Sequence, residues 1–247
     1  MFRWRRLCAA VFTAVAAFVY WFCLSVGPSR AAEDEESRVI LFSGRDLWRN
    51  GAFAYGGLLM APGGFEQDGL LLKVLISGGL YRYNTSNVVE GRVIGLETAV
   101  QVLPGVRIKR GDLEAKFFFG PDYERHRLWP DDSGNKLRGS SFGLRMAIDL
   151  WYEPTPATMA AMDASLSSIA TSSSARVAFG VRVLDNQFYF GPEIAIFDSE
   201  GYRHLRIGGH FTAMKTGDAE WTAAGGWARD SDGRAGPYVR LNLMQRM

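Results

Sequence analysis

One serine stands in a pattern that hydrolases use. Residues 139–143 read Gly-Ser-Ser-Phe-Gly and fit G-x-S-x-G, which presents a nucleophilic serine on a sharp turn between a strand and a helix. Here Ser141 opens a segment that alternates like a strand, and no helical pattern follows it. The three histidines, His126, His204 and His210, lack the close pairing that is usual for metal ligands. The sequence therefore predicts no catalytic residue, no metal site and no cofactor.

A long connection, expected from Tyr123 to Gly139, mixes aromatic, acidic, basic and amide side chains. An aromatic ring such as that of Trp129 could stack on a sugar face, while the polar groups exchange hydrogen bonds with hydroxyls. The candidates for contact with a glucan are Trp129, Asp131, Asp132, Asn135 and Arg138. The same residues also suit an ordinary loop, because Pro-Asp-Asp and Ser-Gly-Asn form turns and Arg138 can pair with an acid.

A third set consists of isolated charges that recur on one face of alternating segments and are interspersed with Gly, Ala and Ser. A polar, mixed-charge face of this kind is typical of the interior of a membrane barrel. We expect the following side chains to face the lumen: Lys73, Glu97, Arg145, Asp149, Arg176, Arg182, Glu193, Arg206, His210 and Arg240.

Extended strands must position these residues. From Ala175 to Val183, one face carries Val177, Phe179 and Val181 and the other carries Arg176 and Arg182, a period of two that only a strand produces. Similar segments recur along the chain between turn signals such as Ala61-Pro62-Gly63-Gly64 and Pro104-Gly105. They predict a closed antiparallel β-barrel of about 12 strands, with roughly 10 to 14 possible.

Alternation alone does not say which face points outward, since a soluble barrel has the same period with its apolar face inside. Two features favour a membrane barrel: the sparse charges on the polar face and aromatic residues near strand ends, where rings can form girdles at the membrane boundary. The expected girdle residues are Trp48, Tyr81, Tyr83, Trp151, Tyr152, Tyr189, Trp221, Trp227 and Tyr238.

The N-terminal segment predicts export. Three arginines precede an apolar run from Leu7 to Gly27, and small residues follow it up to Ala32, as in a cleaved signal peptide; a retained membrane anchor is the alternative. We expect a signal peptide at 1–32, an acidic tail at 33–38 and a barrel at 39–247. The leader holds four of the 28 basic residues and none of the 26 acids, so the mature chain is slightly acidic and shows no nucleic-acid footprint.

Four groups of residues resemble a known family: Leu41-Phe42-Ser43-Gly44-Arg45-Asp46, Phe53-Ala54-Tyr55-Gly56-Gly57, Pro130-Asp131-Asp132 with Asn135 and Arg138-Gly139, and Phe190-Gly191-Pro192-Glu193. Together they are similar to the BcsS family of cellulose biosynthesis proteins. The resemblance covers most of the mature chain, and none of its motifs is catalytic. It implies an outer-membrane barrel that acts in cellulose production or export.

These observations lead to one expectation and two rivals. We expect a non-enzymatic barrel in the bacterial outer membrane that supports cellulose biosynthesis, export or surface anchoring, with outer-membrane lipid, cellulose and other cellulose-secretion components as partners and no nucleic acid. The rivals are a general small-solute porin and an outer-membrane hydrolase that would depend on Ser141 or His210.

Overall fold

The structure is a computed structural model and describes residues 37–184, 187–200 and 202–247. The expected signal peptide, most of the acidic tail and the turn signal Asp185-Asn186 lie outside the described residues. In the part of the chain that is described, no helix is long and apolar enough to cross a bilayer.

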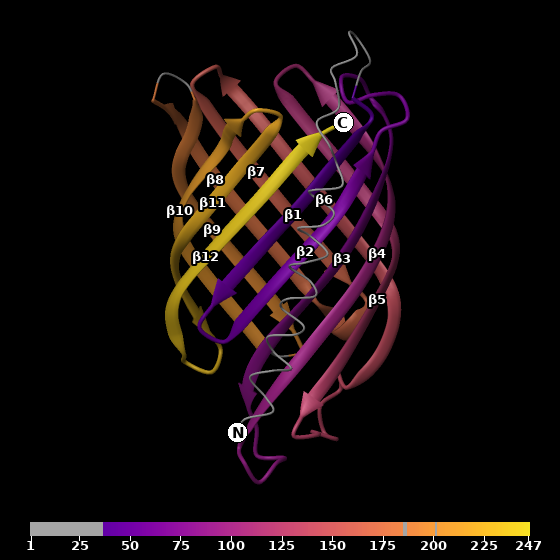
Figure 1. The fold of residues 1–247 in the computed structure, drawn as a ribbon, viewed down its shortest axis with the longest axis vertical. Helices are drawn as coiled ribbons and strands as arrows, with labels where there is room; N and C mark the ends of the chain where they lie inside the picture. The colour runs from indigo at the N-terminus through magenta and orange to yellow at the C-terminus, as the bar shows by residue number, and fades with distance from the viewer. Residues whose placement is uncertain (1–36, 185–186, 201) are drawn as a thin grey trace.

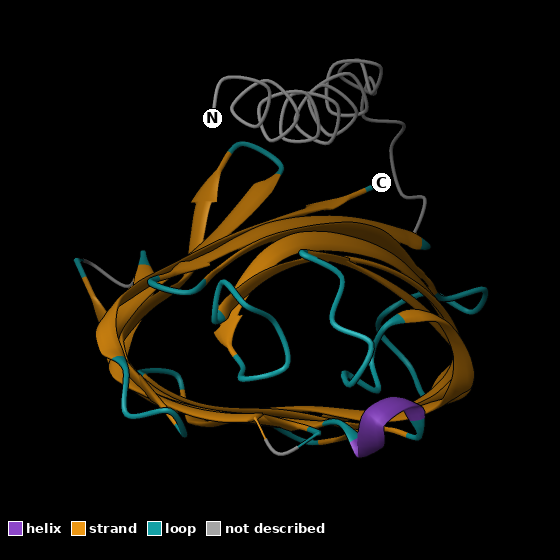
Figure 2. Cartoon of the chain, turned by 90° about the horizontal axis from the view of Figure 1, so that it is seen from below, coloured by secondary structure: helices purple, strands orange, loops and turns teal. Residues whose placement is uncertain are grey.

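Twelve strands form one closed sheet. Each strand is antiparallel to its neighbours in sequence, and the last pairs with the first. The wall tilts relative to the long axis (Figure 1) and closes into a ring when seen along the barrel (Figure 2). The expected closed antiparallel barrel of about twelve strands is confirmed. The strands are β1 (Val39–Trp48), β2 (Gly51–Met60), β3 (Gly69–Asn84), β4 (Arg92–Arg110), β5 (Leu113–Trp129), β6 (Gly139–Thr155), β7 (Thr158–Ser167), β8 (Ser173–Val183), β9 (Phe188–Ser199), β10 (Tyr202–Thr216), β11 (Ala219–Asp230) and β12 (Ala235–Arg246).

The two ends of the barrel carry different connections. The end at which β1 begins and β12 finishes, here called the terminus end, holds the loop 61–68 and tight turns such as the one at Gly111, whose φ of 57° favours glycine. The opposite end, here called the loop end, carries the loops 85–91 and 130–138, together with the short 3-10 turn η1 (Ile169–Thr171).

The apolar face of the strands points outward. In β8, the outward side chains of Phe179 and Val181 are 57% and 52% exposed, whereas the inward side chain of Ala178 is fully buried. The same outward apolar rows recur on β4, β5, β6, β9, β10 and β12. A soluble protein would not leave so large an apolar belt in water, while lipid covers it without cost and a closed sheet leaves no unpaired strand edge. The orientation of the faces is therefore that of a membrane barrel.

Two expected connections are wrong. Pro104-Gly105 does not form a turn, because both residues lie inside β4 and are paired with β3. The expected long connection from Tyr123 to Gly139 is shorter, because β5 continues to Trp129 and pairs with β4 along that stretch. From Asp122 to Leu128 both faces carry polar groups, so no alternation marks the strand.

Candidate functional site in the barrel lumen

Polar side chains from strands that are not neighbours meet inside the wall. Lys73 on β3 lies 3.1 Å from Asp149 on β6, and Arg206 on β10 lies 2.5 Å from Asp46 on β1. Since three strand steps separate each pair, these contacts form across the interior. Strand register places all of the expected lumen residues on this inner wall: Lys73, Glu97, Arg145, Asp149, Arg176, Arg182, Glu193, Arg206, His210 and Arg240.

One inner network centres on Glu193, which is 3% exposed. Its carboxylate accepts hydrogen bonds from Arg240 at 2.5 Å and from the Tyr238 hydroxyl at 2.9 Å. Arg176 lies 3.5 Å from the same carboxylate and donates to Asp163 at 2.7 Å. A buried carboxylate needs such compensation, since an isolated buried charge is costly. The network therefore ties β7, β8, β9 and β12 together through charge.

A second inner network lies toward the loop end and centres on Arg145. Its guanidinium donates to Asp122 at 2.8 Å and to Glu124 at 3.1 Å. Asp122 also accepts from the Ser167 hydroxyl at 2.7 Å. His126 extends the network, with Nε2 3.5 Å from Glu124 and Nδ1 2.9 Å from the Tyr81 hydroxyl.

Sequence reasoning missed the acidic half of this second network. Asp122, Glu124 and His126 lie on β5; Glu124 and His126 fall in the stretch that was expected to be a loop, and Asp122 directly precedes it. Arg145 was expected to face the lumen, but its partners were not foreseen. The one available signal for an inner face was that Asp122, Glu124 and His126 occupy every second position. This signal was hidden because the outward residues Arg125 and Arg127 are also charged.

An outer-membrane hydrolase would depend on Ser141 or His210, and these two side chains form no hydrogen bond with each other in the described structure. Ser141 lies in β6 opposite Glu124 of β5, and a strand continues after it instead of a helix. His210 is fully buried, and both of its ring nitrogens have partners: Nδ1 lies 2.8 Å from the Thr212 hydroxyl and Nε2 lies 3.0 Å from the Phe179 carbonyl oxygen. These bonds hold the ring in a fixed structural position.

Most of the expected girdle aromatics lie inside the barrel. Tyr189 and Tyr238 are 1% and 2% exposed, and Trp48, Tyr81, Tyr83 and Trp151 share their inner face by register. The expectation of an outer position is wrong for these six residues, whereas Tyr152, Trp221 and Trp227 do lie on the outer face.

Glycines on other strands explain how the inner rings fit. A Cβ atom at Gly95 of β4 would clash with the ring of Tyr81 on the adjacent β3, and one at Gly208 of β10 would clash with the hydroxyl of Tyr238 on β12, two strands away. Each ring therefore lies along the wall over a position that has no side chain. Sequence does not reveal this arrangement, because it depends on which strand residues face each other across the register.

Aromatic rings gather on the inner wall at the loop end. The Tyr81 and Tyr83 rings are 6.2 Å apart and stacked, next to His126. A second group joins Trp48 to His204, with ring centroids 5.3 Å apart, and His204 stacks at the same distance on Phe197. Ring faces next to carboxylates and guanidinium groups give this part of the lumen the two kinds of surface that a sugar chain can use: flat apolar faces and hydrogen-bonding groups.

The loop 130–138 is held by its own residues and by contacts with β3 and the loop 85–91. Asp132 is 1% exposed and accepts hydrogen bonds from Tyr83, from Asn87 and from the Gly134 amide. Burial acts to raise the pKa of Asp132, but these hydrogen bonds outweigh it and hold the pKa below its usual value.

The other four candidates for contact with a glucan divide between the loop and the outer wall. Arg138 donates to Asp131 at 2.6 Å, and the Asn135 side chain accepts from the Leu137 amide. Trp129 lies on the outer face of the barrel, in register with Ile94. The structure therefore brings Asp131, Asp132, Asn135 and Arg138 together in the loop and places Trp129 apart from them on the outer face of β5.

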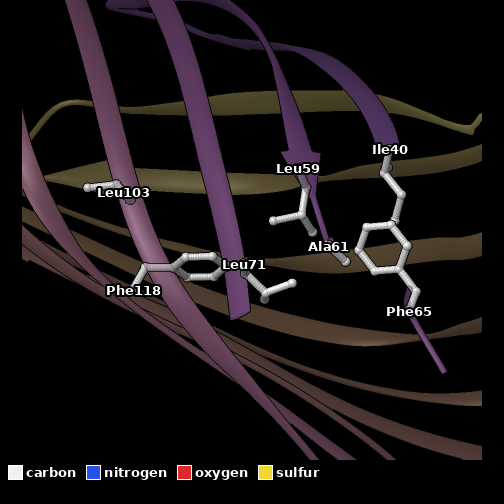
Figure 3. Packing of buried hydrophobic residues seen from close by; sticks show 7 residues of the cluster. All are labelled: Ile40, Leu59, Ala61, Phe65, Leu71, Leu103 and Phe118. Atoms are coloured by element: carbon white, nitrogen blue, oxygen red, sulfur yellow. The ribbon is translucent and has the colours of Figure 1, made fainter. Parts of the chain in front are cut away.

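The inner wall toward the terminus end carries an apolar cluster beside the ion pairs of Lys73 with Asp149 and of Arg107 with Glu114. Buried side chains from β1 to β5 and from the loop 61–68 form the cluster: Ile40, Leu59, Ala61, Phe65, Leu71, Leu103 and Phe118. Figure 3 shows Phe65 against Ile40 and Phe118 beside Leu71. The sequence did not predict this cluster, since runs such as Leu70-Leu71-Leu72 are apolar on both faces and give no sign of which face is inside.

Comparison with protein families gives one match that covers nearly all of the described chain. The family described as cellulose biosynthesis protein BcsS matches residues 40–247. No curated protein matches the sequence.

Solved structures with similar folds are membrane barrels. An outer membrane channel from Pseudomonas putida F1 has 11% identity and a TM-score of 0.53, and the match covers 90% of this chain and all of that one. The translocator domain of the autotransporter NalP from Neisseria meningitidis has 12% identity and a TM-score of 0.50 and covers 95% and 97%. The KdgM porin has 10% identity and a TM-score of 0.45 and covers 84% and 99%. At such identities the likeness is one of fold alone.

Proposed function

The chain belongs to the BcsS family of cellulose biosynthesis proteins, and from this premise we propose that it is a non-enzymatic outer-membrane barrel that supports the export or surface anchoring of cellulose. The observation that carries the proposal is the loop-end inner wall, where the stacked rings of Tyr81 and Tyr83 lie beside His126, which contacts Glu124, and where Trp48 lies beside His204.

We further propose the course of the chain in the cell. Residues 1–32 direct export and are cleaved, residues 33–38 form a short acidic tail, and residues 39–247 insert into the outer membrane. Outer-membrane barrels have short periplasmic turns and longer extracellular loops. The loops 85–91 and 130–138 therefore favour an orientation with the loop end outside the cell and both chain termini in the periplasm.

The chemistry of the inner wall suits a neutral glucan. The faces of a glucose ring are apolar and pack on aromatic rings, while its hydroxyls lie at the ring edge and exchange hydrogen bonds with carboxylates and guanidinium groups. Tyr81 and Trp48 supply ring faces in this proposal, and Glu97, which faces His126 in the register, supplies a carboxylate. Contact of this kind guides or retains a chain and needs no bond to be broken, which is why we propose no catalytic residue.

Deletion of the chain in its host tests the cellulose role. We expect cellulose synthesis in isolated inner membranes to stay unchanged, while cellulose secreted into the medium or retained on the surface falls. Complementation with the wild-type chain restores it, and complementation with Trp48→Ala and Tyr81→Ala together restores it less. Secreted and surface-bound cellulose that both stay at wild-type levels after deletion would contradict the proposal.

The two rivals predict different results. A general small-solute porin conducts ions in planar bilayers and is indifferent to cello-oligosaccharides, whereas we expect these oligosaccharides to bind the wild-type barrel and to bind the Trp48→Ala, Tyr81→Ala variant more weakly. A hydrolase loses its effect on cellulose with Ser141→Ala, whereas we expect this variant to complement the deletion fully.

A further inference from the structure

A groove of about 770 Å³ lies on the outer face of the barrel at the loop end. Arg92 and Ile94 of β4 line it together with Trp129 and with Glu90 of the loop 85–91. Ile94 is paired on one side with Arg82 of β3 and on the other with Trp129 of β5. The groove therefore opens toward the surroundings of the barrel and is separate from the lumen site.

Exposed arginines surround this groove. Arg82, Arg125 and Arg127 are exposed and point outward, and Arg82 donates to the Arg49 carbonyl oxygen with only one of its terminal nitrogens. Neither Arg125 nor Arg127 forms an ion pair within residues 37–184, 187–200 and 202–247. Gly78 and Thr98 lie in the register row of Arg125, and their small side chains leave room on the wall beside it.

Apolar side chains share two of the arginine rows, with Ile94 beside Arg82 and Leu96 beside Arg127, and they replace the arginines in the next row toward the terminus end. Ile76, Val100 and Phe142 lie in the row that follows Arg125 toward the terminus end, and all three are exposed. A charge that faces lipid is strongly destabilising at the centre of the membrane and nearly neutral at its boundary. The change from arginine to apolar residues therefore indicates the level at which head groups meet hydrocarbon.

Three carboxylates at this end are directed away from the arginines. Asp122 and Glu124 bond Arg145 inside the barrel, and Asp131 pairs with Arg138 in the loop. Glu90 lines the groove itself, as does Arg92. The outer surface around Arg82, Arg125 and Arg127 is thus basic at the boundary of the membrane, next to the exposed ring of Trp129.

We propose that this surface binds the phosphorylated sugar head group of a glycolipid in the outer leaflet, with phosphate on Arg82, Arg125 and Arg127 and the sugar against Trp129. Guanidinium groups bind phosphate through paired, charge-assisted hydrogen bonds, and indole rings favour the boundary between hydrocarbon and water. The acyl chains of such a lipid would continue along the apolar rows of β4 and β5. The inference rests on the proposed outer-membrane location.

The test uses the mature barrel, folded in non-ionic detergent, and three probes: bisphosphorylated lipid A carrying a fluorophore, the same lipid after dephosphorylation, and inorganic phosphate. We expect lipid A to bind, dephosphorylated lipid to bind at least about tenfold more weakly, and phosphate alone not to compete at the same concentration. The combined variant Arg125→Gln, Arg127→Gln is expected to lose about tenfold in affinity or more. Equal binding of the two lipids, or competition by phosphate alone, would overturn the proposal.

A matched control is available on the far wall. Arg229 is exposed and outward near the loop-end terminus of β11, and we expect Arg229→Gln to bind lipid A like the wild type; an equal loss would show that any surface charge suffices. Migration before and after boiling checks folding, and Arg82→Gln serves if the double variant does not fold. Cellulose secretion is measured separately, so that failure of lipid binding and failure of the cellulose role remain distinguishable.

Discussion

Two regions of the inner wall are stabilised in different ways. Toward the terminus end, side chains such as Leu103 and Phe118 form an apolar cluster, as in the core of a soluble protein. Toward the loop end, Arg145, Asp122 and Glu124 are buried together and stabilise one another through hydrogen bonds. Burial is comparable in the two regions, but the apolar cluster depends on shape and the charged network on ion pairing. Of the two, the charged network has the groups that can exchange hydrogen bonds with a ligand.

Removing the central cation should have the largest effect. Arg145→Met leaves Asp122 and Glu124 buried without their partner, and we expect a loss of about 3–5 kcal/mol in the free energy of unfolding, measured by urea titration in phospholipid vesicles. Arg138→Met is the control, since its ion pair with Asp131 is half exposed and is worth at most about 1 kcal/mol. Similar losses for the two variants would contradict the role of buried charge.

A cavity at the terminus end should cost somewhat less. Leu103 is 1% exposed inside the barrel, whereas its neighbour Val102 is 39% exposed outside. Leu103→Ala should destabilise the barrel by about 3 kcal/mol, because the surrounding cluster cannot close the space. Val102→Ala should cost about 1 kcal/mol or less, because lipid fills the gap. The same urea titration compares them, and equal costs would mean that the cluster is loosely packed.

Substitution of Gly95 tests whether the Tyr81 ring packs against this glycine. An Ala at Gly95 would push against the Tyr81 ring, since the new Cβ would lie 2.6 Å from the hydroxyl, and we expect a loss of about 1–3 kcal/mol. Removing the ring as well, in Tyr81→Ala with Gly95→Ala, should recover part of this loss. Gly56→Ala is the control, because its nearest neighbour would be 3.8 Å away. A double-mutant cycle without coupling would show that the two residues do not press on each other.

The smallest effect concerns pH and is confined to a loop. Because hydrogen bonds lower the pKa of Asp132 below its usual 3.8 in the folded state, its contribution to stability is fully present above about pH 4 and is lost as the pH falls through the lower, folded-state pKa. We expect the fluorescence of the neighbouring Trp129 to report a change below pH 4. In Asp132→Asn this acid transition should be absent; its persistence would assign it to another carboxyl.

Much of the fold could be predicted from sequence, and less of the site. Alternation from Ala175 to Val183 identifies a strand and its two faces, because a period of two survives in any sheet. The register that brings Arg145 to Asp122, and Lys73 to Asp149 three strands away, could not be predicted, since a shift of one residue changes every facing pair. The room for Tyr189 and Tyr238 inside the barrel likewise depended on Gly180 and Gly208 of other strands.

By itself, the sequence determined the strand content, the number of strands, the alternation of polar and apolar faces and the family. These are local properties, carried by the order of side chains along one strand. The tertiary structure decided which face is outside, which charges pair across the lumen, and where on the inner wall the apolar cluster and the charged network lie. Those features arise only when the sheet closes, because closure brings together side chains that the chain itself keeps far apart.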